Sequence, residues 1–214
     1  MALLVPVRVT EMGRVGLSEA ERQEKRRIRS LKELFQYIRE DKRVNDNSIF
    51  RPGFQAMVVY RFGVWREGIT PKILRLPFTL LYRIAHIFVR NFYGIELPFS
   101  TRIGRRLRVA HQHSIIVHPD TVIGDDCMIR QGVSIGIARV AKSKPGKSLA
   151  PVLGDRVEVG ANATIIGPVK IGNDVAIGPN VCVINNVPDN SMVIGPMPRT
   201  IPRPKGVTGS ERKT

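Results

Sequence analysis

Aromatic residues, cysteines and long apolar runs are all scarce in this chain of 214 residues, which has 6% aromatics and two cysteines. Two cysteines cannot form the disulfide framework of a small secreted domain, and we expect Cys127 and Cys182 to be buried free thiols in a reducing cytoplasm. No uncharged apolar run reaches the roughly 18 residues of a membrane-spanning helix. The apolar start of the chain lacks the basic segment that begins a signal peptide. These absences lead us to expect a cytoplasmic protein.

Acidic residues are also few, because 18 Asp and Glu face 34 Lys and Arg, which gives a formal net charge of +16 at pH 7. The excess is spread along the chain, and its basic stretches hold few aromatic side chains on which bases could stack. We therefore expect no nucleic-acid partner. A diffuse positive field suits anionic ligands such as a phosphorylated cofactor or a nucleotide-linked sugar, and an anionic membrane surface is a second candidate.

Between residues 103 and 183 the apolar pattern follows neither the period of a helix nor that of a strand. Within each run an aliphatic residue recurs every six residues, usually with a small or β-branched residue two positions earlier. The twelve aliphatic positions are Ile103, Val109, Ile115, Ile123, Ile129, Ile135, Leu153, Val159, Ile165, Ile171, Ile177 and Val183. Seven of them are followed by glycine, which we expect to turn the corners because it tolerates positive φ. The pattern predicts a solenoid of short strands and tight corners.

Helices are predicted ahead of the solenoid, at residues 18–40 with Ser18 as the N-cap, at 53–67 after Pro52, and at 74–91. The third helix mixes Leu, Ile and Phe with three arginines. It could lie on a membrane surface, or pack against its neighbours or another subunit.

The chain is expected to divide into three regions: an N-terminal arm and helical region at 1–93, the solenoid at 94–195, and a basic Pro-rich tail at 196–214. A basic loop without strand signals, residues 137–151, interrupts the solenoid. We expect this protruding loop to be functional because the repeat does not need it.

Five stretches of the sequence resemble one known family. They read RPGFQAMVVYRFGVW, GIELPFSTRIGRRLRVAHQHSIIV, IGDDCMIRQGVSIG, VLGDRVEVGANATIIGPVKIGNDVAIGPN and VIGPMPR. Together, over about residues 40–205, they resemble a hexapeptide-repeat acetyltransferase of the serine acetyltransferase branch. The resemblance implies an α+β fold, with an N-terminal α-helical region followed by a left-handed parallel β-helix. It also implies a homotrimer or a dimer of trimers, with acetyl-CoA bound as the acetyl donor in the groove between adjacent prisms.

The resemblance also assigns the residues of acetyl transfer. His111 matches the catalytic histidine of the family, and Glu96 falls on the position of its orienting aspartate. Acetyl transfer from a thioester needs a base that accepts the hydroxyl proton and an acid that returns it to sulfur, and one imidazole held by a carboxylate does both. The family positions that contact the cofactor carry over onto Gly136, Ala138, Ala161, Pro179 and Arg199.

The neighbouring histidines allow a different interpretation. His113 stands two residues before Ile115, in the position that is small and inward in other repeats, so a structural role is expected. A metal site like that of the γ-class carbonic anhydrases, which share this fold, would need His111, His113 and His118 to converge. Convergence from so short a span is not expected, and we predict no metal.

The sequence departs from serine acetyltransferases where the acceptor is recognised. The family has an acidic residue directly before the catalytic histidine and an Arg-His pair before the proline that re-enters the coil. Here these positions hold Ala110 and the pair Leu149-Ala150. A free amino acid needs opposite charges around its ammonium and carboxylate, so the departures favour O-acetylation of a saccharide or sugar-linked acceptor. Asp41 and Arg61 join Ala110 as acceptor-binding candidates.

Other basic side chains could meet phosphates of the cofactor or the acceptor. They are Lys142, Lys144 and Lys147 in the loop, with Arg102, Arg105, Arg106 and Arg108 in the first coil. Two alternatives stay open beside the saccharide acetyltransferase: a serine O-acetyltransferase of cysteine biosynthesis, and a non-catalytic trimeric scaffold. The presence of His111 argues against the scaffold.

Overall fold

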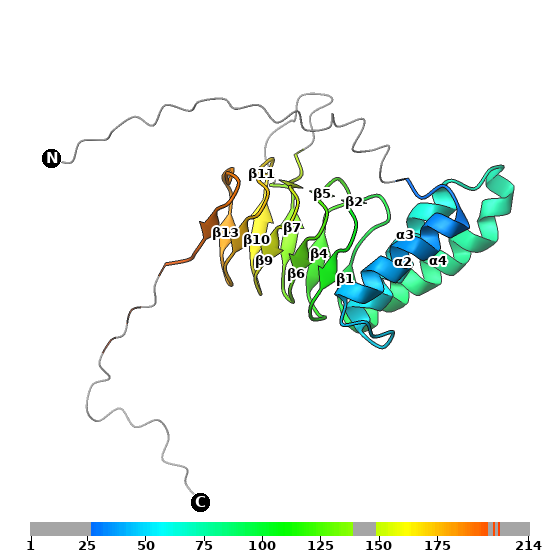
Figure 1. Cartoon of the computed structure of the whole chain (residues 1–214), viewed down its shortest axis with the longest axis horizontal. Coiled ribbons are helices and arrows are strands. Elements are labelled where there is room, and N and C mark those ends of the chain that lie inside the picture. The colour runs from blue at the N-terminus through cyan, green and yellow to red at the C-terminus, as the bar shows by residue number, and fades with distance from the viewer. Residues whose placement is uncertain (1–26, 139–148, 197–198, 200, 202–214) are drawn as a thin grey trace, which may run out of the picture.

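A bundle of helices lies against one end of a stack of short β-strands (Figure 1). The computed structural model describes residues 27–138, 149–196, 199 and 201. The helices are α2 (Leu31–Val44), α3 (Pro52–Glu67), the 3-10 helix η1 (Lys72–Arg75), α4 (Leu76–Phe88) and the π-helix η2 (Val89–Tyr93). In the described part of the chain, none of them is long and apolar enough to cross a membrane.

The first helix begins later than predicted. Ser30 is its N-cap, and the Ser30 hydroxyl accepts a hydrogen bond from the amide of Glu33 at 3.1 Å. The residues just before Ser30 are not helical, so the predicted start is wrong, and Ser18 itself lies outside the described residues. The second helix is confirmed, with Pro52 at its first position. The third is confirmed as the succession of η1, α4 and η2.

The strands form three parallel sheets. Sheet A contains β1 (Ile95–Glu96), β4 (Ile115–Val117), β7 (Ser134–Gly136), β10 (Thr164–Ile166) and β13 (Cys182–Val183). Sheet B contains β2 (Arg102–Ile103), β5 (Val122–Ile123), β8 (Val152–Leu153) and β11 (Lys170–Ile171). Sheet C contains β3 (Arg108–Val109), β6 (Met128–Ile129), β9 (Glu158–Val159), β12 (Ala176–Ile177) and β14 (Met192–Val193). Successive strands change sheet, so each coil contributes one strand to each face of a prism, as the predicted β-helix requires.

The six-residue pattern marks the core of the prism. All twelve aliphatic positions are buried, and none is more than 4% exposed. The small or β-branched residues two positions earlier, such as Thr121, Ala163 and Val175, are buried as well. Each coil thus sends two side chains per face inward, and stacking the coils joins them into one continuous hydrophobic core.

The glycines that follow the aliphatic positions have a different role from the one predicted. None of those seven has positive φ, a conformation found instead at polar corner residues such as Asp126, Asn162 and Asp174. A Cβ added to Gly124 would overlap the carbonyl oxygen of Gly154 in the next coil. A Cβ at Gly160 would lie 2.7 Å from backbone carbon of Gly178. Close stacking of coils, and not the turn itself, therefore requires glycine at positions 104, 124, 154, 160 and 172.

The first coil has a longer corner between sheets C and A. Val109 pairs with Ile129 and Val117 pairs with Ile135, so eight positions of the first coil match six of the second. The two additional residues are absorbed between His111 and Ser114, where His113 adopts a φ of 77°. His113 is exposed, which corrects the prediction that it points inward, because the longer corner moves Val117 into the core position.

Side chains of the helices complete the open edge of the first coil. The Asn45 side chain donates to the Leu107 carbonyl at 3.1 Å and accepts from the Val109 amide at 3.0 Å, much as a neighbouring strand would. The Tyr60 hydroxyl likewise donates to the Thr101 carbonyl at 2.7 Å. Strand edges left without a partner are costly, so the helical region acts as the cap of the solenoid.

Arg61 and Asp41 belong to the same contact between the helical region and the first coil, which we call the cap joint. They form a two-pronged ion pair, with Nε–Oδ2 and Nη2–Oδ1 distances of 2.7 and 3.2 Å. Arg61 also donates to the carbonyls of Ile103 and Gly104 at 3.2 and 2.6 Å. Asp41 is 0% exposed and Arg61 is 2% exposed. This corrects the expectation that the two residues bind the acceptor, because both are enclosed and already paired.

The two cysteines differ. Cys127 is buried, and burial raises the pKa of its thiol to about 12. Cys182 is exposed, contrary to prediction, because it precedes the inward Val183 and the alternation of a strand turns it outward.

Candidate active site

His111 lies on the long corner between β3 and β4. The backbone around it is fixed, since the amide of Ala110 donates to the Ile129 carbonyl at 3.0 Å and the amide of His113 donates to the Tyr93 carbonyl at 2.8 Å. The His111 side chain is exposed. A held backbone with an exposed imidazole is suited to proton transfer with a bound substrate.

Glu96 lies on the adjoining sheet A. It is half-buried in β1, opposite Ile116 of β4. Among the described residues, neither a hydrogen bond nor an ion pair joins its carboxylate to His111. The carboxylate does act on a different imidazole: burial and the charge of Arg90 lower the pKa of His86, and the charge of Glu96 opposes that shift.

The other two corner histidines are engaged elsewhere. The side-chain amide of Gln112 donates to Nε2 of His113 at 3.1 Å, and the amide of Asp120 donates to Nδ1 of His118 at 3.2 Å. Within the described ranges, no three His, Cys, Asp or Glu side chains gather as metal ligands. His111, His113 and His118 therefore do not form the cluster that the carbonic-anhydrase interpretation needs.

His111 shares one edge of the prism with two of the predicted cofactor residues. Val109, Ile129, Val159 and Ile177 stand in register across sheet C, so the residues two positions later, among them His111, Ala161 and Pro179, follow one another along the C–A edge. Both Ala161 and Pro179 line a groove of about 280 Å³ on this side of the molecule.

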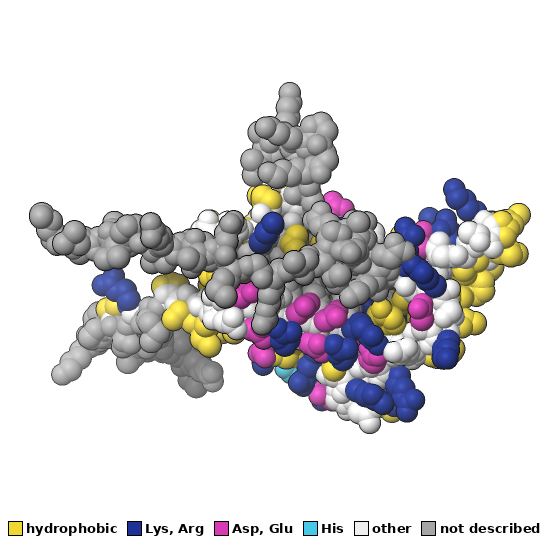
Figure 2. All heavy atoms as spheres, turned by 45° about the horizontal axis from the view of Figure 1, so that its top comes forward, with side chains coloured by type: hydrophobic (Ala, Val, Ile, Leu, Met, Phe, Trp, Pro, Cys, Tyr) yellow, Lys and Arg dark blue, Asp and Glu magenta, His cyan; other side chains and the backbone are white. Residues whose placement is uncertain are grey.

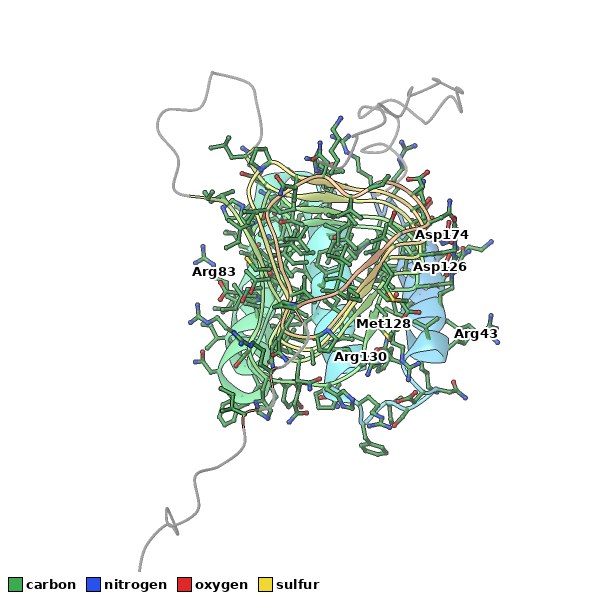
Figure 3. All side chains as sticks on the ribbon, turned by 90° about the vertical axis from the view of Figure 1, so that its left-hand side faces the viewer. Arg43, Arg83, Asp126, Met128, Arg130 and Asp174 are labelled. Atoms are coloured by element: carbon green, nitrogen blue, oxygen red, sulfur yellow. The ribbon has the colours of Figure 1, made fainter. Side chains whose placement is uncertain are left out.

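The groove has a charged wall that sequence reasoning missed. Arg130 and Glu158 line it together with Met192. Figure 3 shows Arg130 and Met128 on the same side of the prism. Arg130 follows Ile129 where two later coils have glycine, and this break in the pattern could have revealed it. The next residue, Gln131, has a buried side-chain oxygen without a hydrogen-bond partner in the described structure.

Gly136 and Ala138 lie at the opposite edge of sheet A, where β7 ends and the chain leaves the sheet. The amide of Gly167 donates to the Gly136 carbonyl at 3.0 Å, and a Cβ on Gly167 would lie 3.8 Å from the Cβ of Ala138. A Cβ on Gly136 itself would meet nothing within 4 Å. The packing of the described chain therefore does not demand glycine at position 136. The predicted cofactor residues thus form two groups separated by sheet A, while Arg199 is exposed beyond the last strand.

The basic residues of the first coil are mostly paired within the chain. Arg105 pairs with Glu40, Arg106 pairs with Asp126, and Arg108 pairs with Asp46 at 2.9 Å. These ion pairs tie the first coil to α2, to the turn that follows α2, and to the second coil. They correct the expectation that Arg105, Arg106 and Arg108 are available for phosphates. The loop lysines Lys142, Lys144 and Lys147 lie outside the described residues.

The three positions at which the sequence departs from serine acetyltransferases, 110, 149 and 150, hold small or apolar side chains that are half-buried or buried. Ala110 is half-buried beside His111, and Ala150 is 3% exposed at the point where the chain re-enters the coil. Leu149 is half-buried next to it.

Comparisons with known proteins agree with this architecture. Residues 150–185 match the family described as bacterial transferase hexapeptide (six repeats). The chain is 34% identical over 161 residues to a protein of Escherichia coli K12 named as a colanic acid biosynthesis acetyltransferase, WcaB, covering 73% of this chain and 93% of that one. It is 33% identical over 150 residues to the serine acetyltransferase of Helicobacter pylori 26695, covering 70% of this chain and 81% of the relative.

A solved structure supports the fold. Serine acetyltransferase isoform 3 of Entamoeba histolytica, in complex with cysteine, superposes with a TM-score of 0.63 at 22% identity. The match covers 79% of this chain and 61% of the amoebic chain. The repeated core, the capped solenoid and relatives matched over most of their length lead to one conclusion: the chain belongs to the hexapeptide-repeat acetyltransferases, in the branch of the serine acetyltransferases.

Proposed function

We propose that the protein transfers an acetyl group from acetyl-CoA to a hydroxyl of a saccharide or a sugar-linked acceptor. The observation that carries this proposal is the absence of charged side chains at three positions where the resemblance predicts groups that recognise an amino acid. Ala110 and the pair Leu149-Ala150 replace charged residues of the family, and the Asp41–Arg61 pair is enclosed in the cap joint. A sugar hydroxyl needs neutral hydrogen bonding, whereas an amino acid needs paired charges. The likeness to WcaB points the same way.

In the proposed reaction the oxygen of the acceptor hydroxyl attacks the thioester carbonyl while His111 accepts the proton of that hydroxyl. The C–S bond then breaks, and the imidazolium returns the proton to the CoA sulfur, so charge and protons balance. Glu96 is the carboxylate that holds the imidazole in the correct tautomer. Such proton transfer contributes about 10²–10⁴-fold to rate.

The site is completed by assembly of a homotrimer or a dimer of trimers. The His111–Ala161–Pro179 edge of one subunit then faces the Gly136–Ala138 edge of its neighbour, and acetyl-CoA lies in the groove between them. The unobstructed position beside Gly136 supports this arrangement, because a side chain there would occupy space that the chain itself leaves open.

The test is CoA release from acetyl-CoA by the purified protein. L-serine is compared with hexoses, aminosugars and sugar nucleotides. We expect turnover with a saccharide, reduced about 10²–10⁴-fold in His111→Ala and little changed in His118→Ala. The control is matched because His118 is a neighbouring histidine, just beyond β4, whose ring accepts a hydrogen bond from the Asp120 amide.

Turnover with serine alone would contradict the saccharide proposal. It would instead favour a serine O-acetyltransferase, the candidate that the likeness to the Helicobacter enzyme supports. Equal activity of wild type and His111→Ala would overturn the assignment of the base. Glu96→Gln should lower kcat with little change in KM for acetyl-CoA, since the carboxylate acts through the imidazole.

A further inference from the structure

The helical end of the molecule carries a large apolar surface that the described residues leave uncovered. We call it the α4 face and define it by nine side chains whose exposed fractions range from 45% to 71%. They are Ile73, Leu74, Leu76, Leu80, Leu81, Ile84, Ile87, Phe88 and Phe92. Figure 2 shows hydrophobic side chains at this end of the molecule, with Lys and Arg beside them. Apolar patches of this extent on a subunit mark a protein or membrane contact.

The α4 face is not the surface by which α4 packs on its own chain. Tyr82 and Val89 are buried; the ring of Tyr82 contacts Phe99 edge to face and the guanidinium of Arg66 at 4.6 Å. The spacing of Leu76, Leu80, Ile84 and Ile87 puts them on the side of the helix away from Tyr82. The helix therefore has two apolar sides, and the described part of the chain covers one of them.

The segment that carries the α4 face has charges of one sign, since residues 68–95 contain Lys72, Arg75, Arg83 and Arg90 but no Asp or Glu. Arg75 is paired with Glu67, which precedes this segment. Arg83 and Arg90 are exposed and seven residues apart, which places them at one border of the α4 face. Figure 3 shows Arg83 pointing away from the body of the molecule, on the side opposite Arg43. An apolar surface bordered by cations complements a layer of anionic headgroups above acyl chains.

A second copy of the chain related by a two-fold axis is a poorer occupant. A two-fold contact would bring each α4 face against itself, so that cations would meet cations with no acidic side chain from residues 68–95 between them.

We propose that the α4 face docks on an anionic lipid surface, with its apolar side chains in the headgroup boundary and Arg83 and Arg90 on lipid phosphates. The chain runs from α4 through η2 directly into β1, which carries Glu96. Docking would bring the membrane close to the first coil. On the proposed function, the acceptor would then be a sugar carried by a lipid; the docking itself does not rest on that function.

The test is co-sedimentation of the full chain with phosphatidylcholine vesicles, with and without phosphatidylglycerol. We expect binding only to the anionic vesicles, weakened by high salt. The double variant Arg83→Gln/Arg90→Gln should lower the partition coefficient about thirtyfold. Arg39→Gln/Arg43→Gln removes the same charge from exposed positions on α2 and should leave binding within about twofold.

An apolar pair of variants tests the other half of the surface. Leu80→Ser/Ile84→Ser should lower binding by at least about tenfold, whereas Ile49→Ser/Phe50→Ser, at side chains that are 53% and 81% exposed, should not. Unchanged thermal unfolding serves as the check that each variant folds.

Three results would overturn the proposal: no binding of the wild type to anionic vesicles, equal binding of the α4 variants and their controls, or dissociation of a lipid-free oligomer by the α4 variants in light scattering. The last would make the α4 face a subunit contact. Because vesicle binding and CoA release are measured separately, failure of docking leaves the acetyl-transfer assay to decide the proposed function.

Discussion

The solenoid and the helical region are held together in different ways. In the solenoid, backbone pairs with backbone and every coil repeats the same inward aliphatic positions. The helical region meets the first coil through apolar side chains, among them Ala56, Met57 and Val89, which belong to the same hydrophobic core. It also meets the coil edge through polar side chains, chiefly Asn45, Tyr60 and Arg61. It also leaves an apolar helix face uncovered.

The two regions differ because the first coil of the repeat has another coil on one side only. An inner coil finds its hydrogen-bond partners in the coils on both sides, so its side chains need only fill the core. The first coil has no preceding coil, and its free amides and carbonyls must be met by something else. The helices supply side-chain groups in place of a strand. Four substitutions test this comparison, and they are ordered by the size of the expected effect.

Arg61→Met should break the joint between the two regions most severely. It leaves the Asp41 carboxylate buried without its partner, which costs about 3–5 kcal/mol in the free energy of unfolding. Burial raises the pKa of Asp41, and the Arg61 guanidinium opposes that shift. Without Arg61, folded Asp41 holds its proton to higher pH than unfolded Asp41. The loss is therefore full at neutral pH and shrinks as pH falls toward about 4.

Urea unfolding at neutral and acidic pH measures this loss. The double variant Arg61→Met/Asp41→Leu is the control, because it removes the stranded charge and should recover much of the stability. A loss of equal size at both pH values would show that the buried carboxylate is not its cause.

Gly124→Ala should damage the solenoid itself by about 3 kcal/mol. The new methyl group would overlap the backbone of Gly154, which cannot move without shifting a whole coil. Gly136→Ala is the matched control and should change the free energy of unfolding by less than about 0.5 kcal/mol, because its Cβ would meet no atom of the described chain within 4 Å. Similar unfolding curves for both variants would contradict the role of stacking.

Asn45→Ala should cost about 2 kcal/mol. It removes the side chain that meets Leu107 and Val109, and both backbone groups are left in a buried place. Asn186 makes a similar contact, accepting from the Lys170 amide at 2.8 Å, but it is exposed. Water can replace Asn186, so Asn186→Ala should cost less than about 1 kcal/mol. Thermal unfolding of the two variants measures the difference in stability that burial of the Asn45 contact produces.

Asp126→Asn should have the smallest effect, below about 1 kcal/mol, because the Arg106–Asp126 pair is partly exposed and screened by water. The hydrogen bond from Arg106 lowers the pKa of Asp126. Its contribution is therefore present above about pH 4 and is lost as pH falls through the lower folded pKa. Unfolding at low and high salt measures it, and a salt-independent loss would contradict a surface ion pair.

The sequence predicted the inward face of the solenoid position by position because a repeat is local. Ile103 or Ile165 lies in the core for the same reason that its neighbours six residues away do. The prediction that the glycines provide positive φ at the corners was wrong. Only the stacked coils show how closely the backbone of Gly154 approaches Gly124. His113 was misplaced because a two-residue insertion is invisible without the pairing of Val117 with Ile135.

For the candidate site, sequence and resemblance named His111, and register aligned it with Ala161 and Pro179. They did not reveal Arg130 and Glu158 in the groove, because outward residues carry no periodic signal. The engagement of Asp41 with Arg61 was also hidden, because it joins side chains 20 residues apart in sequence on two helices.

By itself the sequence determined the six-residue repeat, the β-helix and the helices before it, because these depend on which side chains must leave water within a few residues of chain. The tertiary structure decided how the helices close the first coil, which polar residues are enclosed there, and which apolar face stays open. Those outcomes depend on contacts between groups 20 to 64 residues apart. Geometry in space, and not local pattern, sets which of these groups can meet.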